Sequence, residues 1–188
     1  MKNKQYVIFD LDGTLVDSFP TVVNACKRVF AEYAPAEMPD DACFETYRFQ
    51  DMEKVFKELA GRAAMSVAAF RSYYDLQYRK DYINGTTVIA KQLSLLNTAK
   101  SQGLGVIILT NKRQELAEQV CTLLLGSNKI DVIIGRLDSY PIKPRGCLMP
   151  LLSRGIMPSQ CLRYYGDSET DRQTAQLLNI DYINTKKY

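Results

Sequence analysis

The amino-acid sequence predicts an α/β protein: a Rossmann-like core built on a parallel sheet, with an α-helical domain inserted after the first strand. Two observations predict this architecture. Short apolar runs alternate with helical patterns over most of the chain, and one continuous block of about 65 residues shows helical spacing only. The length of 188 residues allows one good core and a small insertion.

Five short apolar runs predict buried strands, because such runs are typical of a parallel sheet covered on both faces. They are residues 6–9, 104–109, 132–134, 162–165 and 180–183. Helical patterns separate most of them. The predicted helices are residues 87–102 closed by Gly103, residues 112–125 closed by Gly126, a helix with Pro144 in its first turn, and residues 170–178 with Asn179 as a left-handed cap.

The exception to this alternation is residues 17–83, where no strand pattern occurs. Apolar residues such as Val22 and Val29 follow helical spacing, and residues 44–60 and 66–82 continue with two more helical patterns. Asp17 or Ser18 is expected to cap the first of these helices. The sequence therefore predicts a core domain of residues 1–16 and 84–188 and a helical domain of residues 17–83.

The composition is that of an ordinary globular protein and excludes several classes of partner. The net charge of +3, without a run of lysine and arginine, gives no reason to expect a nucleic-acid partner. No apolar segment approaches the roughly 20 residues that span a membrane, so no membrane partner is expected, and the N-terminal apolar run is too short for a signal peptide. The chain is expected to act as a monomer or a homodimer.

The cysteines and histidines restrict the chemistry further. The five cysteines are scattered and form no CxxC pair, so neither disulfides nor a structural zinc site are expected, and a reducing, cytoplasmic setting fits best. The chain has no histidine, which excludes Ser-His-Asp and Cys-His catalysis and histidine-bound zinc. Proton transfer in an enzyme of this sequence must use carboxylates, lysine, tyrosine, cysteine or water.

Polar side chains follow four of the predicted strands, where the carboxyl ends of a parallel sheet form one edge and bind ligands. These side chains are Asp10 and Asp12, Thr110 and Asn111, Lys143, and Asp167 and Asp171. Clustered carboxylates are tolerated when a hard cation such as Mg²⁺ neutralises them. A lysine and a threonine hydroxyl can hold the oxygens of a phosphoryl group, and Gly13 exposes backbone amides to an anion. Together these groups suggest phosphoryl transfer.

The same four segments resemble, in order, the motifs of the haloacid dehalogenase superfamily of phosphohydrolases. They read DLDGT at residues 10–14, ILTN around Thr110, Lys143 before Pro144, and GDSETD at residues 166–171. The resemblance covers the whole chain, identifies the inserted helical domain as a cap, and fits best the phosphoglycolate phosphatase-like subgroup.

The resemblance implies a role for each of these residues. Asp10 would be the nucleophile that forms an aspartyl-phosphate, and Asp12 would act as acid and base. The carboxylates of Asp10 and Asp167 and the backbone carbonyl of Asp12 would bind Mg²⁺, and Asp171 would support the metal through water. The group that binds the phosphoryl oxygens would comprise Thr110, Asn111 and Lys143, and Lys143 would also pair with Asp10.

The sequence thus predicts a Mg²⁺-dependent phosphatase acting on a small phosphorylated metabolite, with a cap that closes over the site. Two alternatives stay open: a phosphomutase of the β-phosphoglucomutase type, and an inactive binding protein built on the same scaffold. A dehalogenase is disfavoured, because a second carboxylate at Asp12 has little role in that reaction. The sequence leaves the substrate open, since specificity depends on the shape of the cap.

Overall fold

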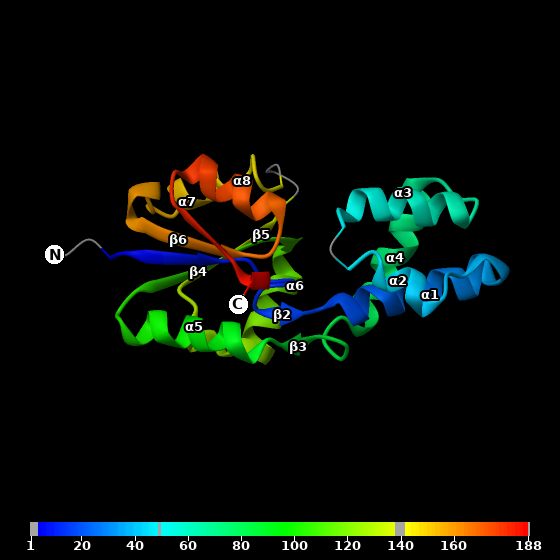
Figure 1. The fold of residues 1–188 in the computed structure, drawn as a ribbon, viewed down its shortest axis with the longest axis horizontal. Helices are drawn as coiled ribbons and strands as arrows, with labels where there is room; N and C mark the ends of the chain where they lie inside the picture. Colours follow the sequence, from blue (N-terminus) through cyan, green and yellow to red (C-terminus); the bar gives the residue numbers. More distant parts are fainter. Residues whose placement is uncertain (1–3, 49, 138–141, 188) are drawn as a thin grey trace. The chain divides into compact units, whose positions relative to one another are not determined.

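The computed structural model describes residues 4–48, 50–137 and 142–187, and the chain forms two compact units. The first unit is Met1–Asp17 together with Thr87–Tyr188, and the second is Ser18–Thr86. Figure 1 shows a sheet covered by helices in the first unit and a group of helices in the second.

A five-stranded parallel sheet forms the centre of the first unit, with the strand order β5-β4-β1-β6-β7. Its strands are β1 (Tyr6–Phe9), β4 (Gly105–Arg113), β5 (Val132–Arg136), β6 (Cys161–Gly166) and β7 (Asp181–Asn184). Each predicted apolar run coincides with one of these strands. The predicted α/β class with a parallel sheet is therefore confirmed.

Helices lie on both sides of this sheet. The helices α7 (Leu148–Leu152) and α8 (Glu169–Leu178) lie on one side, and α5 (Ala90–Ser101) lies on the other (Figure 1). The buried cluster that joins the sheet to α7 and α8 includes Ile8, Ile107, Leu109, Ile134, Leu151, Tyr164, Ala175 and Leu178. Side chains alternate between the two faces of a strand. Asp10, two residues after Ile8, therefore follows the register of the α7–α8 face.

Two predicted helices of the first unit begin later than their patterns suggest. Residues 87–88 form β3 (Thr87–Val88), which pairs antiparallel with β2 (Val16–Asp17), so α5 begins only at Ala90. Of the two residues expected to cap the first helix, Asp17 is thus part of a strand, and Ser18 occupies the N-cap position of α1 (Phe19–Tyr33) without a side-chain capping bond. Residues 112 and 113 continue β4, and the next helix is α6 (Gln114–Val120), followed by a π-helical turn (Cys121–Gly126).

The helix predicted to start at Pro144 is wrong, because residues 143–146 form a turn and α7 starts only at Leu148. The Lys143 backbone N–H donates to Asn111 Oδ1 at 2.7 Å, and the Gly146 N–H donates to the Ile142 carbonyl at 3.1 Å. These bonds fix the segment in a turn that the local sequence does not indicate. The predicted end of α8 is confirmed, since Asn179 is left-handed with φ 54°.

The second unit consists of α1 (Phe19–Tyr33), α2 (Asp41–Glu45), α3 (Met52–Arg62) and α4 (Val67–Asp81). The single helix predicted over residues 44–60 is wrong: Asp51 starts α3 as its N-cap and accepts a bond from the Glu53 N–H at 2.9 Å.

Short 3₁₀ turns occur in both units, at Pro35–Glu37, Ser127–Lys129, Pro158–Gln160 and Thr185–Lys187. Among the described residues, no helix is both long and apolar enough to cross a membrane.

Asp131 joins three segments of the first unit before β5 begins. Its carboxylate accepts hydrogen bonds from Lys4 Nζ at 2.5 Å, Lys100 Nζ at 2.9 Å and the Val106 N–H at 2.8 Å. Partial burial alone would raise the pKa of Asp131, but these donors lower it from 3.8 to about 2. The folded state therefore favours the charged carboxylate.

We expect Asp131→Asn to lower the melting temperature by about 2–4 °C near neutral pH, equivalent to about 1 kcal/mol for this partly exposed group. The folded pKa lies below the unfolded value of 3.8, so the stabilisation is fully present above the unfolded value and is lost as the pH falls through about 2. Thermal denaturation as a function of pH measures this. The control is Asp181→Asn, at an exposed position of β7. A difference between Asp131→Asn and the wild type that does not change down to the lowest pH would contradict the assignment.

Candidate active site

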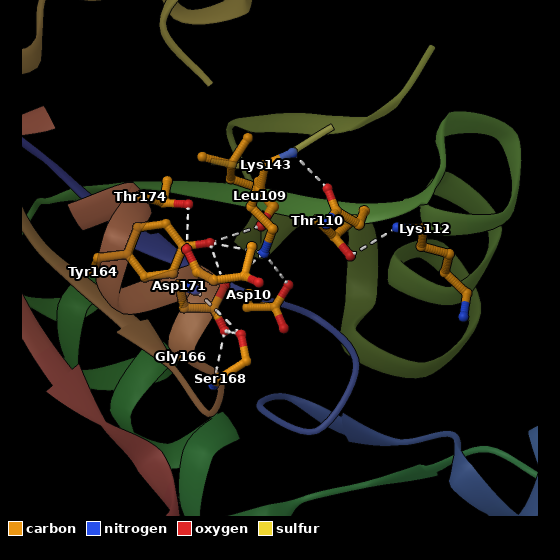
Figure 2. A network of polar contacts seen from close by, with 12 residues as sticks. Asp10, Leu109, Thr110, Lys112, Lys143, Tyr164, Gly166, Ser168, Asp171 and Thr174 are labelled. Carbon is orange, nitrogen blue, oxygen red and sulfur yellow. Dashed lines mark hydrogen bonds and ion pairs between the residues drawn. The ribbon is translucent and has the colours of Figure 1, made fainter. Parts of the chain in front are cut away.

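Asp10 and Lys143 form a buried ion pair at the carboxyl edge of the sheet. Asp10 follows β1 directly and is 6% exposed, and Lys143 is 7% exposed. The ammonium of Lys143 donates to Asp10 Oδ1 at 2.8 Å and to Asp171 Oδ1 at 2.6 Å (Figure 2). One buried positive charge therefore contacts two carboxylates. The contact of Lys143 with Asp10 is the pairing that the family resemblance implies.

The charges of this group do not balance. Burial would lower the pKa of Lys143, but the neighbouring carboxylates of Asp10 and Asp171 raise it above its usual range, so the ammonium stays charged. Burial raises the pKa of Asp10, and the charge of Asp171 raises it further; Lys143 offsets only part of this shift. The pKa of Asp167 is also raised, first by burial and then by Asp171, and Lys186 Nζ at 3.5 Å from Asp167 Oδ2 offsets part of this shift. The three carboxylates thus carry more negative charge than Lys143 and Lys186 neutralise, which favours binding of a cation.

The carboxylates fit a hard divalent cation. Carboxylate oxygens of Asp10, Asp167 and Asp171 all lie within 4.8 Å of one another, and oxygen ligands are those that Mg²⁺ prefers. Gly13 brings the loop after β1 against this group: its φ is +80°, and a Cβ at this position would lie 2.6 Å from Asp167 Oδ2. A glycine is required here both for its conformation and for the close approach.

The first turn of α8 fixes the position of Asp171. Ser168 is the N-cap, and its backbone N–H donates to Asp171 Oδ2 at 3.1 Å while its hydroxyl lies 2.5 Å from the same oxygen. In return, the Asp171 N–H donates to Ser168 Oγ at 3.2 Å, which completes a capping box. Burial would raise the pKa of Asp171, but the charge and hydrogen bond of Lys143 lower it, and hydrogen bonds from Ser168 and Tyr164 lower it further. Asp171 is therefore held as a carboxylate.

Asp12 lies apart from the three clustered carboxylates. Its Oδ1 accepts a hydrogen bond from Lys112 Nζ at 2.8 Å, and the side chains of Asp12 and Lys112 are 32% and 4% exposed. Since β1 ends at Phe9, the alternation of a regular strand does not extend to Asp12. The local sequence pattern predicts Lys112 in a helix, whereas it lies in β4, and the pattern gives no sign of this contact.

Thr110 and Asn111 lie at the neighbouring end of β4. The Thr110 side chain is buried, and its Oγ1 accepts from the Lys112 backbone N–H at 3.2 Å (Figure 2). The Asn111 side chain holds the backbone of Lys143 in place. The structure thus brings Asp10 and Asp171 into direct contact with Lys143, and the direct phosphate contacts of Thr110, Asn111 and Lys143 stay a prediction.

Two further residues that the motifs did not single out take part in this network. Ser168 could have been found from the S-x-x-D pattern that starts a helix, which is a capping-box signature. Tyr164 gives no such local signal, because its hydroxyl becomes relevant only once β6 lies beside β1.

Gly166 makes room for Asp171, since a Cβ at Gly166 would lie 2.5 Å from Asp171 Cβ. We expect Gly166→Ala to lower the free energy of unfolding by about 1–3 kcal/mol, because neither backbone can move freely. The matched control is Gly61→Ala in α3, where an added Cβ meets nothing within 4 Å. This control should raise the free energy of unfolding by about 0.5–1 kcal/mol. Denaturant unfolding measures both, and an unchanged midpoint for Gly166→Ala would be inconsistent with the packing described.

The comparisons with known proteins give the family. Residues 7–185 match the family described as haloacid dehalogenase-like hydrolase. The phosphoglycolate phosphatase of Yersinia pestis is 30% identical over 177 residues, covering 90% of this chain and 75% of that protein. The phosphoglycolate phosphatase of Rhodobacter capsulatus is 27% identical over 181 residues, covering 94% of this chain and 82% of that protein.

A solved structure supports the same fold. A haloacid dehalogenase-like family hydrolase from Streptococcus pneumoniae superposes with a TM-score of 0.81 at 24% identity, covering 98% of this chain and 85% of that one. At this identity the likeness shows the fold alone. The match over residues 7–185 shows the family: this chain belongs to the haloacid dehalogenase-like hydrolases.

Proposed function

We propose that this chain is a Mg²⁺-dependent phosphatase that hydrolyses a small phosphorylated metabolite through an aspartyl-phosphate on Asp10. The predicted enzyme class, a phosphoric monoester hydrolase, is confirmed by the family and by relatives named phosphatases. The nucleophile, the metal and the kind of substrate belong to the proposal. The observation that supports it most is the buried Asp10 carboxylate, bonded to Lys143 at 2.8 Å beside a second and a third carboxylate.

In the first step, a carboxylate oxygen of Asp10 attacks phosphorus, and the bond from phosphorus to the ester oxygen of the leaving group breaks. Asp12, as a carboxylic acid, gives its proton to that oxygen. In the second step, the Asp12 carboxylate takes a proton from water, and the water oxygen attacks phosphorus. The bond to Asp10 breaks, inorganic phosphate leaves, and both carboxyl groups return to their starting states.

The other residues hold these groups in place. Lys143 offsets the charge on Asp10, and Lys112, bonded to Asp12 at 2.8 Å, orients the carboxylate that moves the protons. Asp10 and Asp167 would hold Mg²⁺ together with the backbone carbonyl of Asp12. Asp171 would support the metal through water. When bound, Mg²⁺ supplies positive charge to the oxygens of the phosphoryl group.

The proposed substrate class is supported by the names of the relatives, and its selection is assigned to the second, helical unit. Phosphoglycolate is named in relatives that are 27–30% identical to this chain over the aligned residues, which makes it the first compound to test. The helical unit would act as the cap that selects the leaving group, and Thr110 and Asn111 would meet the phosphoryl oxygens. The phosphomutase and the inactive binding protein remain alternatives, which an assay of phosphate release against sugar-phosphate isomerisation separates.

A monomer or homodimer in a reducing, cytoplasmic setting is part of the same proposal. The reducing setting is supported by the cysteines, since all five are free thiols: Cys26, Cys43, Cys121, Cys147 and Cys161. Burial raises the pKa of Cys26 to about 12 and that of Cys161 to about 11, so these thiols are poor nucleophiles and poor candidates for catalysis.

Asp10→Asn should lower kcat/KM for phosphate release by about a thousandfold or more, because a neutral amide cannot act as the nucleophile. The variant should stay folded by circular dichroism, since the amide has the same shape. The matched control is Asp181→Asn, which should keep the wild-type rate. Near-wild-type turnover by folded Asp10→Asn would rule out the mechanism.

Removal of divalent cations with EDTA should abolish phosphate release, and Mg²⁺ should restore it. Asp167→Asn should raise the Mg²⁺ concentration needed for half-maximal activity by about tenfold or more, because one charged ligand is lost. Activity is measured across a Mg²⁺ titration for both proteins. Turnover that is indifferent to EDTA would remove the metal from the scheme, and an unchanged Mg²⁺ requirement in Asp167→Asn would remove Asp167 as a ligand.

A further inference from the structure

Asp167 has a counter-ion of its own, separate from Lys143. The Nζ atom of Lys186 lies 3.5 Å from Asp167 Oδ2, and the side chains of Lys186 and Asp167 are 34% and 13% exposed. Lys143 contacts the other two clustered carboxylates, those of Asp10 and Asp171, and its side chain is only 5% exposed. The three carboxylates therefore have one buried ammonium beside them and one that is in contact with water.

The backbone of Lys186 is fixed at this edge of the sheet. Its 3₁₀ turn, residues 185–187, directly follows β7, which pairs in parallel with β6. The Lys186 N–H donates to Asn184 Oδ1 at 3.0 Å, and the carbonyl of the preceding residue accepts from Gln92 Nε2 of α5 at 3.3 Å. The turn thus keeps the base of this side chain close to Asp167, while the flexible four-carbon stem lets the ammonium move.

A divalent cation at this site and the ammonium of Lys186 are attracted to the same carboxylate. Carboxylate oxygens of Asp10, Asp167 and Asp171 lie within 4.8 Å of one another, and Mg²⁺ prefers oxygen ligands of this kind. Two positive charges that approach the same carboxylate repel each other. The metal and the Lys186 ammonium therefore oppose each other at Asp167.

The two lysines of the site differ in how easily they leave their carboxylates. An ion pair with a partly exposed lysine is weak, because water solvates the ammonium when the pair opens. Breaking a buried pair is strongly disfavoured, because it leaves a charge without a partner. Of these two ammonium groups, that of Lys186 is therefore the one that a metal can displace, and that of Lys143 stays with Asp10 and Asp171.

We propose that Lys186 is an exchangeable counter-ion of the metal site, which pairs with Asp167 in the metal-free protein and leaves it when a divalent cation binds. The cation has to displace this ammonium, so the site binds it more weakly than the same carboxylates would without Lys186. The inference rests on the proposed function for the identity of the site, since Asp167 is a metal ligand in that proposal. Its test measures metal binding and needs no turnover.

Two other roles for Lys186 lead to different expectations. A lysine that is only solvated at the surface leaves the affinity for the metal unchanged when it is replaced. A lysine that orients Asp167 for the metal makes binding weaker when it is lost. Exchange alone predicts tighter binding after the ammonium is removed, and a return to the wild-type affinity when an arginine restores the positive charge.

The test compares the full wild-type chain with Lys186→Met, Lys186→Arg and Lys91→Met. The last variant is the matched control, because it removes a lysine at an exposed position of α5 in the same unit. The probe is Mn²⁺, which takes the same oxygen ligands as Mg²⁺, and the electron paramagnetic resonance signal of free Mn²⁺ gives its dissociation constant. At low ionic strength, we expect Lys186→Met to lower this constant by about threefold to tenfold, because one repelling charge is removed. Lys186→Arg and Lys91→Met should stay within about twofold of the wild type.

A dissociation constant for Lys186→Met that is unchanged or higher would overturn the inference, and so would an equal decrease in Lys91→Met. A structure of the wild-type chain with bound Mn²⁺ answers the same question if Lys186→Met does not fold. In it, Nζ of Lys186 should lie more than about 4 Å from both carboxylate oxygens of Asp167, and an intact ion pair contradicts the exchange.

The proposed function fails by different results. A wild type that binds Mn²⁺ but releases no phosphate from any monoester would refute the phosphatase and leave the exchange standing. An affinity that Lys186→Met does not change would refute the exchange and leave the phosphatase standing. A wild type that binds no Mn²⁺ would refute both the exchange and the metal of the proposed mechanism.

Discussion

The buried ammonium of Lys143 is the interaction on which the rest of the site depends. Two carboxylates cannot be buried side by side unless a positive charge and hydrogen bonds compensate them, and breaking such a buried pair typically costs about 3–5 kcal/mol. Lys143 compensates Asp10 and Asp171 at 2.8 Å and 2.6 Å. Without this ammonium, burial would disfavour the charged form of both carboxylates more strongly, because Lys143 lowers the pKa of each.

The topology of the sheet makes this contact possible. The strand β1 lies in the centre of the order β5-β4-β1-β6-β7, so Asp10 emerges between neighbours on both sides. The turn after β5 brings in Lys143, β4 contributes Asn111 to hold that turn, and α8 presents Asp171 from its first turn. Residues more than a hundred positions apart thus meet at one edge because parallel strands end together.

The same burial produces the excess of negative charge that favours a cation. Desolvation raises the pKa of both Asp10 and Asp167, and the two ammonium groups of Lys143 and Lys186 do not offset three carboxylates. A site of this kind favours a divalent cation together with a phosphoryl group. The positive charge of the cation balances the negative charge of the carboxylates and of the phosphoryl oxygens. This is the physical link from the fold to the proposed phosphatase chemistry.

The sequence predicted the parts that follow from local patterns and strand ends. The five apolar runs became the parallel sheet, and Asp10, Lys143 and Asp171 meet because each follows a strand of that sheet. The contacts of Asp12 with Lys112 and of Tyr164 with Lys143 could not be predicted, because they depend on which strands become neighbours. The break before α3 could not be predicted, because the N-cap Asp51 lies inside a helical apolar pattern. The prediction of a helix starting at Pro144 is wrong, because the tertiary hydrogen bond of the Lys143 backbone fixes a turn there.

In the proposed mechanism, the phosphoryl group passes through the Asp10 carboxylate. A single-turnover reaction, quenched within milliseconds and analysed by peptide mass spectrometry, tests this step most directly. We expect a transient phosphate adduct on Asp10 that appears before inorganic phosphate and decays as phosphate is released. Phosphate release with no adduct at any time, measured under conditions that preserve an acyl phosphate, or an adduct on a different residue, would contradict it.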